Sequence, residues 1–153
     1  GCLHAVGGVV RIVELARQDE GLTADLGLRG TRRMIRGDYV KIARAAAAAD
    51  DRAYQLIRQS ADYLGSTLVS IINLLDLDQI ILAGPGFSLV GQIYADAAAE
   101  HLARDFWARS VHAIRVGLSG MGNDVAALGA ASLVLHVQLT AQPHSGRLVA
   151  ASR

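Results

Sequence analysis

A short apolar run followed by a glycine turn constrains the fold of this chain more than any other feature. Residues 80–83 read Ile-Ile-Leu-Ala without polar alternation, and the turn Gly84–Gly86 follows them directly. Strands of α/β sheets that are covered on both faces have this unbroken apolar pattern. Because ligands of such sheets bind beyond the carboxyl ends of the strands, the glycine turn is a candidate binding loop.

The spacing of apolar residues predicts helices over most of the segment before this strand. Apolar residues predict a first helix over 3–18 that ends near Asp19, and an irregular segment over 21–37. Asp38 is expected to cap a helix that runs to about Ala48, and Asp50 or Asp51 to cap a longer one. That longer helix has an apolar stripe typical of a face packed against a partner: Ile57, Ala61, Leu64, Leu68, Ile71 and Leu75.

The segment after the strand predicts two further helices and one more strand. A helix is expected over 88–105, a short strand over 112–118 and a last, buried helix over 125–138, capped by Asn123 or Asp124. Two short strands among five helices are too few for a complete sheet. We therefore expect residues upstream of Gly1 to supply the rest of it.

Composition limits the classes of partner. The net charge of +1 gives no electrostatic footprint for nucleic acid. Apolar residues make up 52% of the chain and charged residues 19%, so we expect apolar surface to be buried against another subunit or domain. The single cysteine excludes an internal disulfide, and no leader or membrane-spanning stretch is recognised. A cytoplasmic homo-oligomer that does not contact membranes is the resulting expectation.

Several short stretches, in one unbroken order, carry a family resemblance. Gly1-Cys2-Leu3, then 73–76 (Asn-Leu-Leu-Asp), 80–84 and Gly129-Ala130-Ala131 together resemble the C-terminal part of ROK proteins, which comprise bacterial repressors and sugar kinases. The resemblance covers residues 1 to about 138.

The resemblance implies an α/β fold class. Residues 1–140 would be the helix-rich part of the C-terminal lobe of an actin-like, ribonuclease H-like fold with a short parallel sheet, and 141–153 a flexible tail. The first lobe of that fold, with its phosphate-binding turn and catalytic aspartate, has no counterpart in this chain. DNA would be contacted only through a domain that this chain lacks.

Two N-terminal residues match functional positions of the family. Cys2 matches the last cysteine of its zinc-binding motif, whose other ligands would lie before Gly1; a structural zinc takes four ligands, so Cys2 alone is an ordinary thiol. His4 stands where the family has a glutamate that binds sugar hydroxyls. An imidazole offers one donor and one acceptor instead of two acceptors, and without the family it is a solvated or capping side chain.

Gly84 and Gly86 have two interpretations that the sequence leaves open. They form part of a nucleotide or effector cleft, or they are a tight turn that needs glycine only for its backbone angles. Pro85 lacks an N–H donor and so weakens anion binding. The arginines of 29–36 form the one basic cluster, and we expect a solvated surface there.

Three functions remain open from the sequence. The first is the sugar-sensing and oligomerisation domain of a ROK-type transcriptional regulator, and the second is a fragment of a ROK sugar kinase that phosphorylates a hexose with ATP. The third is a structural or scaffolding domain that no longer binds a ligand. Phosphoryl transfer needs positioned phosphates, a metal ion and a base, and the sequence shows none of these. We therefore expect no cofactor in this chain, zinc or ATP being expectations for the full-length protein only.

Overall fold

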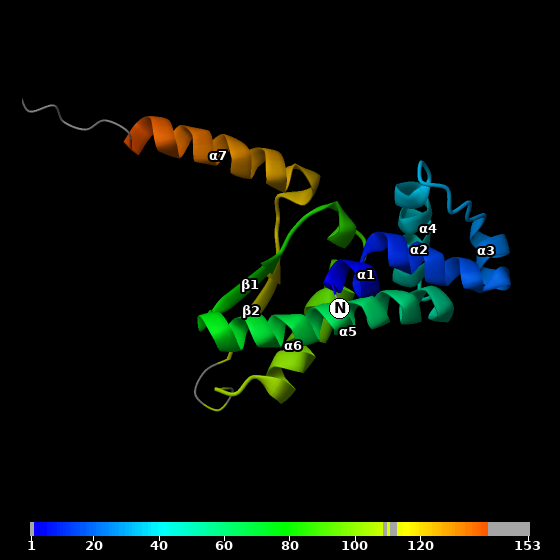
Figure 1. The fold of residues 1–153 in the computed structure, drawn as a ribbon, viewed down its shortest axis with the longest axis horizontal. Helices are drawn as coiled ribbons and strands as arrows, with labels where there is room; N and C mark the ends of the chain where they lie inside the picture. The colour runs from blue at the N-terminus through cyan, green and yellow to red at the C-terminus, as the bar shows by residue number, and fades with distance from the viewer. Residues whose placement is uncertain (1, 109, 111–112, 141–153) are drawn as a thin grey trace, which may run out of the picture.

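The computed structural model describes residues 2–108, 110 and 113–140. These residues form a helix-rich α/β arrangement with one short parallel sheet (Figure 1). Its elements are α1 (Leu3–Gly7), α2 (Val9–Gln18), α3 (Glu20–Leu26), α4 (Ile35–Ala47), α5 (Asp51–Leu75), β1 (Gln79–Leu82), the 3-10 turn η1 (Pro85–Phe87), α6 (Gly91–Asp105), β2 (Arg115–Leu118), the 3-10 turn η2 (Gly122–Asp124) and α7 (Val125–Thr140).

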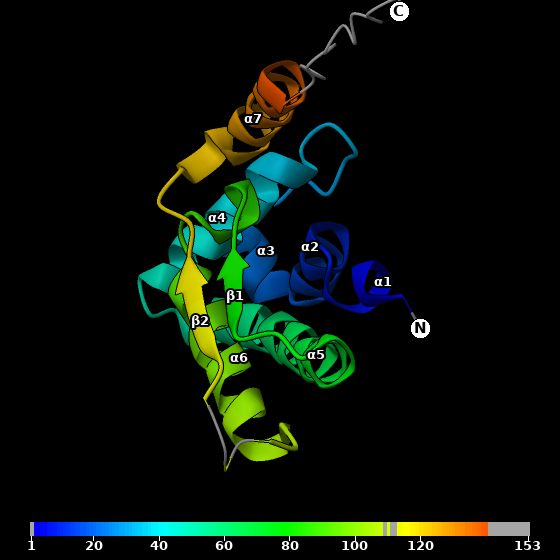
Figure 2. The same ribbon diagram turned by 90° about the vertical axis from the view of Figure 1, so that its left-hand side faces the viewer.

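The two strands lie side by side and run in the same direction (Figure 2). Gln79 pairs with Arg115 and Leu82 pairs with Leu118, with α6 crossing over between them. The predicted parallel sheet is thus confirmed, with β1 close to its expected bounds. His112, at the start of the predicted second strand, and the predicted tail 141–153 lie outside the described residues.

The core lies where α2, α4, α5 and α6 meet. Its large and almost fully buried apolar side chains are Val13, Leu22, Ile42, Ile57, Ile72, Val90 and Phe106. The α5–α6 contact is especially close at Gly65, where an added Cβ would lie 2.7 Å from His101 Cδ2 and 3.2 Å from the Ala97 carbonyl. Gly65 therefore allows these two helices to approach each other closely.

The predicted single helix over 3–18 is wrong at Gly8. Gly8 is extended, with φ −75° and ψ 160°, and it ends α1 and begins α2. A Cβ at this position would also collide with the backbone of His4. The bend turns α1 away from the axis of α2. His4 on α1 therefore does not continue the line of α2.

The prediction of an irregular segment over 21–37 is also wrong at both ends, because α3 covers its first part and α4 begins at Ile35. Asp19 accepts a hydrogen bond from the Leu22 amide at 2.8 Å, and buried Leu22 anchors the new helix α3 to the core. Gly27, in the left-handed conformation with φ +57°, ends α3. Residues 28–34 then form the connection to α4.

Asp38 does not cap α4 as predicted, whereas Asp50 caps α5. Helix α4 begins at Ile35, and Asp38 lies inside it with no exposed surface. Its Oδ2 accepts hydrogen bonds from the amides of Arg29 and Gly30, at 3.0 and 2.6 Å. Asp50 Oδ1 accepts from the Ala53 amide at 2.9 Å, as the sequence predicts.

The apolar stripes of α5 and α7 differ from their predicted burial. On α5, Ile57 and Ala61 are buried as expected, whereas Leu75 is 60% exposed because the buried face passes through Gly65 and Ile72. Helix α7 was expected to be buried but stands apart from the body in both views (Figures 1 and 2). Within the described part of the chain it packs mainly on η2, and Leu133 and Leu139 are exposed.

Candidate ligand pocket

A pocket of about 390 Å³ lies between the N-terminal helices and the glycine turn. The bend between α1 and α2 forms one wall, and η1 with the adjoining faces of α4, α5 and α6 forms the others. Its apolar lining comes from Leu3, Val9, Ile12, Leu64 and Phe87. The Phe87 ring meets the Tyr94 ring edge-on, with the centroids 5.1 Å apart, which fixes this side of the pocket.

Three hydroxyl groups connect opposite sides of the pocket. Tyr39 Oη donates to the Gly86 carbonyl at 2.6 Å, so it joins α4 to the glycine turn. Ser60 Oγ donates to the Gly7 carbonyl at 2.6 Å and lies 2.8 Å from Tyr94 Oη. The pocket is therefore held in shape by hydrogen bonds between residues that are far apart in the sequence.

Both phenols stay protonated well above neutral pH. Burial, followed by the charge and hydrogen bond of Tyr94, raises the pKa of Tyr39 far above its ordinary value of 10.0. Burial also raises the pKa of Tyr94, and its side-chain contacts with Ser60 and Tyr39 only partly offset this effect. Each phenol can thus act as a hydrogen-bond donor under physiological conditions.

His4 lines the mouth of the pocket. It lies in α1 and is exposed, and no hydrogen bond to its imidazole occurs among the residues that the structure describes. An added Cβ on Gly8 would lie 2.9 Å from His4 Nδ1, so the bend holds the ring close to the backbone. A neutral imidazole at this point can offer one donor and one acceptor to a ligand.

The glycine turn reaches the pocket through Gly86 and not through Gly84. Gly86 and Phe87 line the pocket, whereas Gly84 has φ +115° and open space where a Cβ would be. Glycine is therefore needed at Gly84 for its backbone conformation. The Phe87 amide donates to the Gly84 carbonyl at 3.1 Å, so this donor is already used within the turn.

Cys2 does not share the pocket. It is a free, exposed thiol before α1. Among the described residues, no three histidine, cysteine or acidic side chains lie close enough together to hold a metal ion. One thiolate does not meet the four-ligand requirement of structural zinc, so the residues present do not fit zinc on their own.

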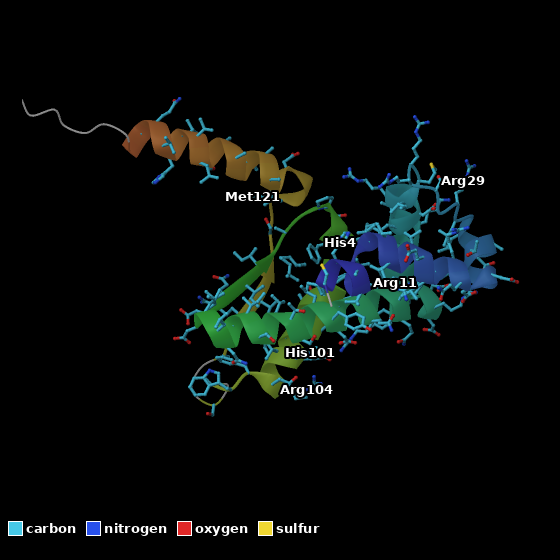
Figure 3. The ribbon with its side chains drawn as sticks, in the orientation of Figure 1. His4, Arg11, Arg29, His101, Arg104 and Met121 are labelled. Carbon is cyan, nitrogen blue, oxygen red and sulfur yellow. The ribbon has the colours of Figure 1, made fainter. Side chains whose placement is uncertain are left out.

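The basic cluster lies away from the pocket. The arginines of 29–36 are exposed and none lines the pocket, in agreement with a solvated surface. Figure 3 shows Arg29 beside α3 and α4, well separated from His4, while His101 and Arg104 lie on α6 on another side of the body. His4 and Gly86 are thus the two predicted site residues that the fold brings together.

Sequence reasoning missed Tyr39, Ser60 and Tyr94. They belong to no motif, and they meet only after α4, α5 and α6 have packed. One signal was available, because Tyr94 lies one helical turn after Val90 on the apolar face of α6. A buried tyrosine usually has a partner for its hydroxyl, so such a position indicates a polar contact inside the core.

A parallel sheet whose first strand ends in a glycine turn beside a pocket is typical of an α/β ligand-binding domain. A model of the ROK family matches residues 19–137, which is most of the chain, and the chain therefore belongs to the ROK family. This family includes both regulators and sugar kinases. The matched range begins after α2, so His4 and Cys2 lie outside it. A search of curated proteins found no match.

Within the part of the chain that the structure describes, no helix is both long and apolar enough to cross a bilayer. This includes α7, whose 16 residues are fewer than the roughly 20 that a span requires.

Proposed function

We propose that this chain is the sugar-sensing and self-associating part of a ROK-type transcriptional regulator. In this proposal residues 1–140 belong to the C-terminal lobe of an actin-like fold, and a sugar or sugar phosphate binds beside His4. DNA is contacted by a domain outside this chain, and the protein acts in the cytoplasm. In the full-length protein, zinc would be held by Cys2 together with ligands outside this chain. In the kinase alternative, the nucleotide would be held by the Gly84–Gly86 turn together with residues outside this chain.

One observation carries the proposal. His4 and Gly86 lie far apart in the sequence, and each was singled out from the sequence for a ligand. Both line the same pocket. The pocket volume of about 390 Å³ is within the roughly 300–1,000 Å³ range of small-molecule sites. Membership of the ROK family supports a sugar-related ligand.

The chemistry of the pocket favours binding over phosphoryl transfer. None of the described residues that line it is a carboxylate, and none is a lysine or an arginine. A kinase site requires a base for the attacking hydroxyl and cations for the phosphates. The kinase alternative would need all of these groups from outside this pocket, whereas recognition of an effector needs only the pocket and His4.

Calorimetric titration with a panel of hexoses and hexose phosphates tests the proposal. We expect saturable binding of one class and tighter binding of neutral hexoses by His4→Glu, because a carboxylate accepts two hydroxyl hydrogen bonds. Gln18→Glu adds the same charge on an exposed position outside the pocket and should not change affinity. Equal affinities in wild type and both variants would contradict a role for His4.

The same titration at two pH values tests the imidazole directly. Titrations are made at about pH 5.5 and about pH 7.5, because histidine is the side chain type that changes charge in this range. A protonated imidazole is a double donor, so if His4 contacts the ligand, sugar phosphates should bind more tightly at the lower pH in wild type and not in His4→Glu. Hexose phosphorylation by the chain in a coupled ATP assay would instead favour the kinase alternative.

A further inference from the structure

The hydrogens of the three pocket hydroxyls can be assigned from their partners. The carbonyls of Gly86 and Gly7 can only accept, so Tyr39 and Ser60 each donate their single proton to them. Since the Ser60 proton is used in this way, the 2.8 Å contact between Ser60 Oγ and Tyr94 Oη requires Tyr94 as the donor. All three hydroxyl protons are thus used within the protein.

The remaining interior surface of the pocket is apolar. Leu3, Val9, Ile12, Leu64 and Phe87 offer neither donors nor acceptors. A sugar ring carries several hydroxyl groups. The oxygens of Tyr39, Ser60 and Tyr94 can still accept a hydrogen bond but have no free proton to donate, so a buried sugar ring would lose more hydrogen bonds to water than the interior can replace. Burial of unpaired polar groups is unfavourable, so the sugar ring itself does not fit the interior.

The mouth of the pocket has the opposite chemistry. His4 is exposed there, and its imidazole has no hydrogen-bond partner among the described residues. A ligand that matches both regions has a polar part at the mouth and an apolar part in the interior. Apolar pockets lined by leucine, isoleucine and phenylalanine side chains accept small aromatic rings.

We propose that the pocket binds a glycoside through its apolar substituent, with an aryl or short alkyl group in the interior and the sugar ring at the mouth beside His4. This inference rests on the proposed function and names the class of effector. The interior then selects the substituent by size and apolarity, and His4 contributes to recognition of the sugar. A free hexose would occupy only the mouth and would bind weakly.

The test compares methyl and phenyl glycosides of glucose, galactose, xylose and N-acetylglucosamine, as both anomers, by calorimetric titration of the whole chain. Burying a phenyl ring is expected to strengthen binding about tenfold or more relative to the methyl glycoside of the same sugar. Leu64→Asn, which places an amide in the interior, should reduce this gain to about twofold or less. Leu68→Asn is the matched control, since Leu68 is equally half-buried on α5 but does not line the pocket.

The outcomes separate this inference from the proposed function. A phenyl gain that Leu64→Asn removes and Leu68→Asn keeps supports the inference. Equal affinity for the methyl and phenyl glycosides in wild type would overturn it and leave a sugar site at His4. Failure of every hexose, hexose phosphate and glycoside to bind would overturn both. A phenyl gain that survives Leu64→Asn would place the substituent elsewhere and overturn the inference alone.

Discussion

At the scale of single residues, Asp38 shows how burial changes the role of a side chain. From the sequence it is a helix cap, but in the structure it holds the backbone that precedes its helix. Its Oδ2 satisfies two amides of the connection between α3 and α4 at a site without solvent exposure. A carboxylate that is buried with such partners is expected to stabilise the fold.

Asp38→Ala should lower the free energy of unfolding by about 2 kcal/mol, because two backbone amides lose their acceptor. Urea denaturation followed by circular dichroism measures this change. Asp25→Ala is the control: Asp25 makes an exposed ion pair with Arg52, whose loss should cost about 0.5 kcal/mol or less. Equal effects of the two substitutions would show that Asp38 does not anchor the connection.

The raised pKa values of Tyr39 and Tyr94 predict a loss of stability in alkali. In the unfolded chain both phenols ionise near 10.0, whereas burial keeps them protonated in the folded state. Their stabilising effect is therefore complete below about pH 10 and is lost as the pH rises above it, by about 1.4 kcal/mol per pH unit for each tyrosine.

The contribution of Tyr39 to the loss of stability in alkali can be measured with one variant. Melting temperatures measured between about pH 8 and about pH 11.5 should be flat at first and then fall, and Tyr39→Phe should reduce the steepness of the fall. A wild-type curve without this fall would contradict the burial of the phenols. An unchanged slope in Tyr39→Phe would contradict the assignment to Tyr39.

At the scale of elements, the contact of α5 with α6 depends on Gly65. The His101 ring and the Ala97 carbonyl occupy the space that a side chain at this position would need. His101 is also held by Asp62, at 3.2 Å from Nε2, so its ring cannot move away without losing this contact. A close packing of this kind responds to the addition of a single methyl group.

Gly65→Ala should therefore destabilise the protein by about 1–3 kcal/mol through overpacking. Gly37→Ala is a matched control, since Gly37 lies within α4 with nothing within 4 Å of an added Cβ. The control should stabilise the protein by about 0.5–1 kcal/mol through its higher helix propensity. Thermal unfolding of both variants measures these changes in stability. Stabilisation by Gly65→Ala would show that α5 and α6 do not pack closely at this position.

Local sequence patterns predicted those elements that depend on local interactions. The apolar run 80–83 predicted β1, and Asp50 after an alanine stretch predicted the start of α5. The family resemblance predicted the parallel sheet. The bend at Gly8 was missed because glycine is compatible with both a helix and an extended residue. Helix α3 was missed because its stability comes from Leu22 in the core and not from periodicity.

The candidate site was predictable only in part for a similar reason. His4 and Gly86 were found from the family resemblance and the strand-to-turn pattern, respectively. Tyr39, Ser60 and Tyr94 complete the pocket through contacts between α4, α5 and α6, which no short motif encodes. Such contacts depend on helix packing, so the sequence pattern did not reveal the hydroxyl connections.

At the scale of the whole molecule, helix α7 presents a run of exposed apolar side chains. It contains no Asp, Glu, Lys or Arg, and Leu133, Val137 and Leu139 are 69%, 61% and 80% exposed. A helix that is apolar all round is normally buried, and exposed apolar patches often mark interfaces. We therefore predict that the chain self-associates through this helix.

Sedimentation velocity at micromolar concentrations should show dimers or larger species of the wild-type chain. Leu133→Glu combined with Leu139→Glu should shift the distribution toward monomer, because a buried unpaired carboxylate is unfavourable. The matched control is Leu74→Glu, at a site on α5 that is 82% exposed and outside α7. A wild-type chain that sediments as a single monomeric species would contradict the prediction.

The central claim is that this ROK-family chain binds its effector in the pocket shared by His4 and Gly86. Backbone amide chemical shifts of the ¹⁵N-labelled chain, recorded while the tightest ligand of the hexose and glycoside panels is added, test it most directly. Gly7, Gly8 and Gly86 should shift together along one saturating curve, whereas Gly37 on α4 and Gly129 on α7 should not. Shifts confined to Gly30 or Gly129, or no saturable shift with any ligand, would contradict the account.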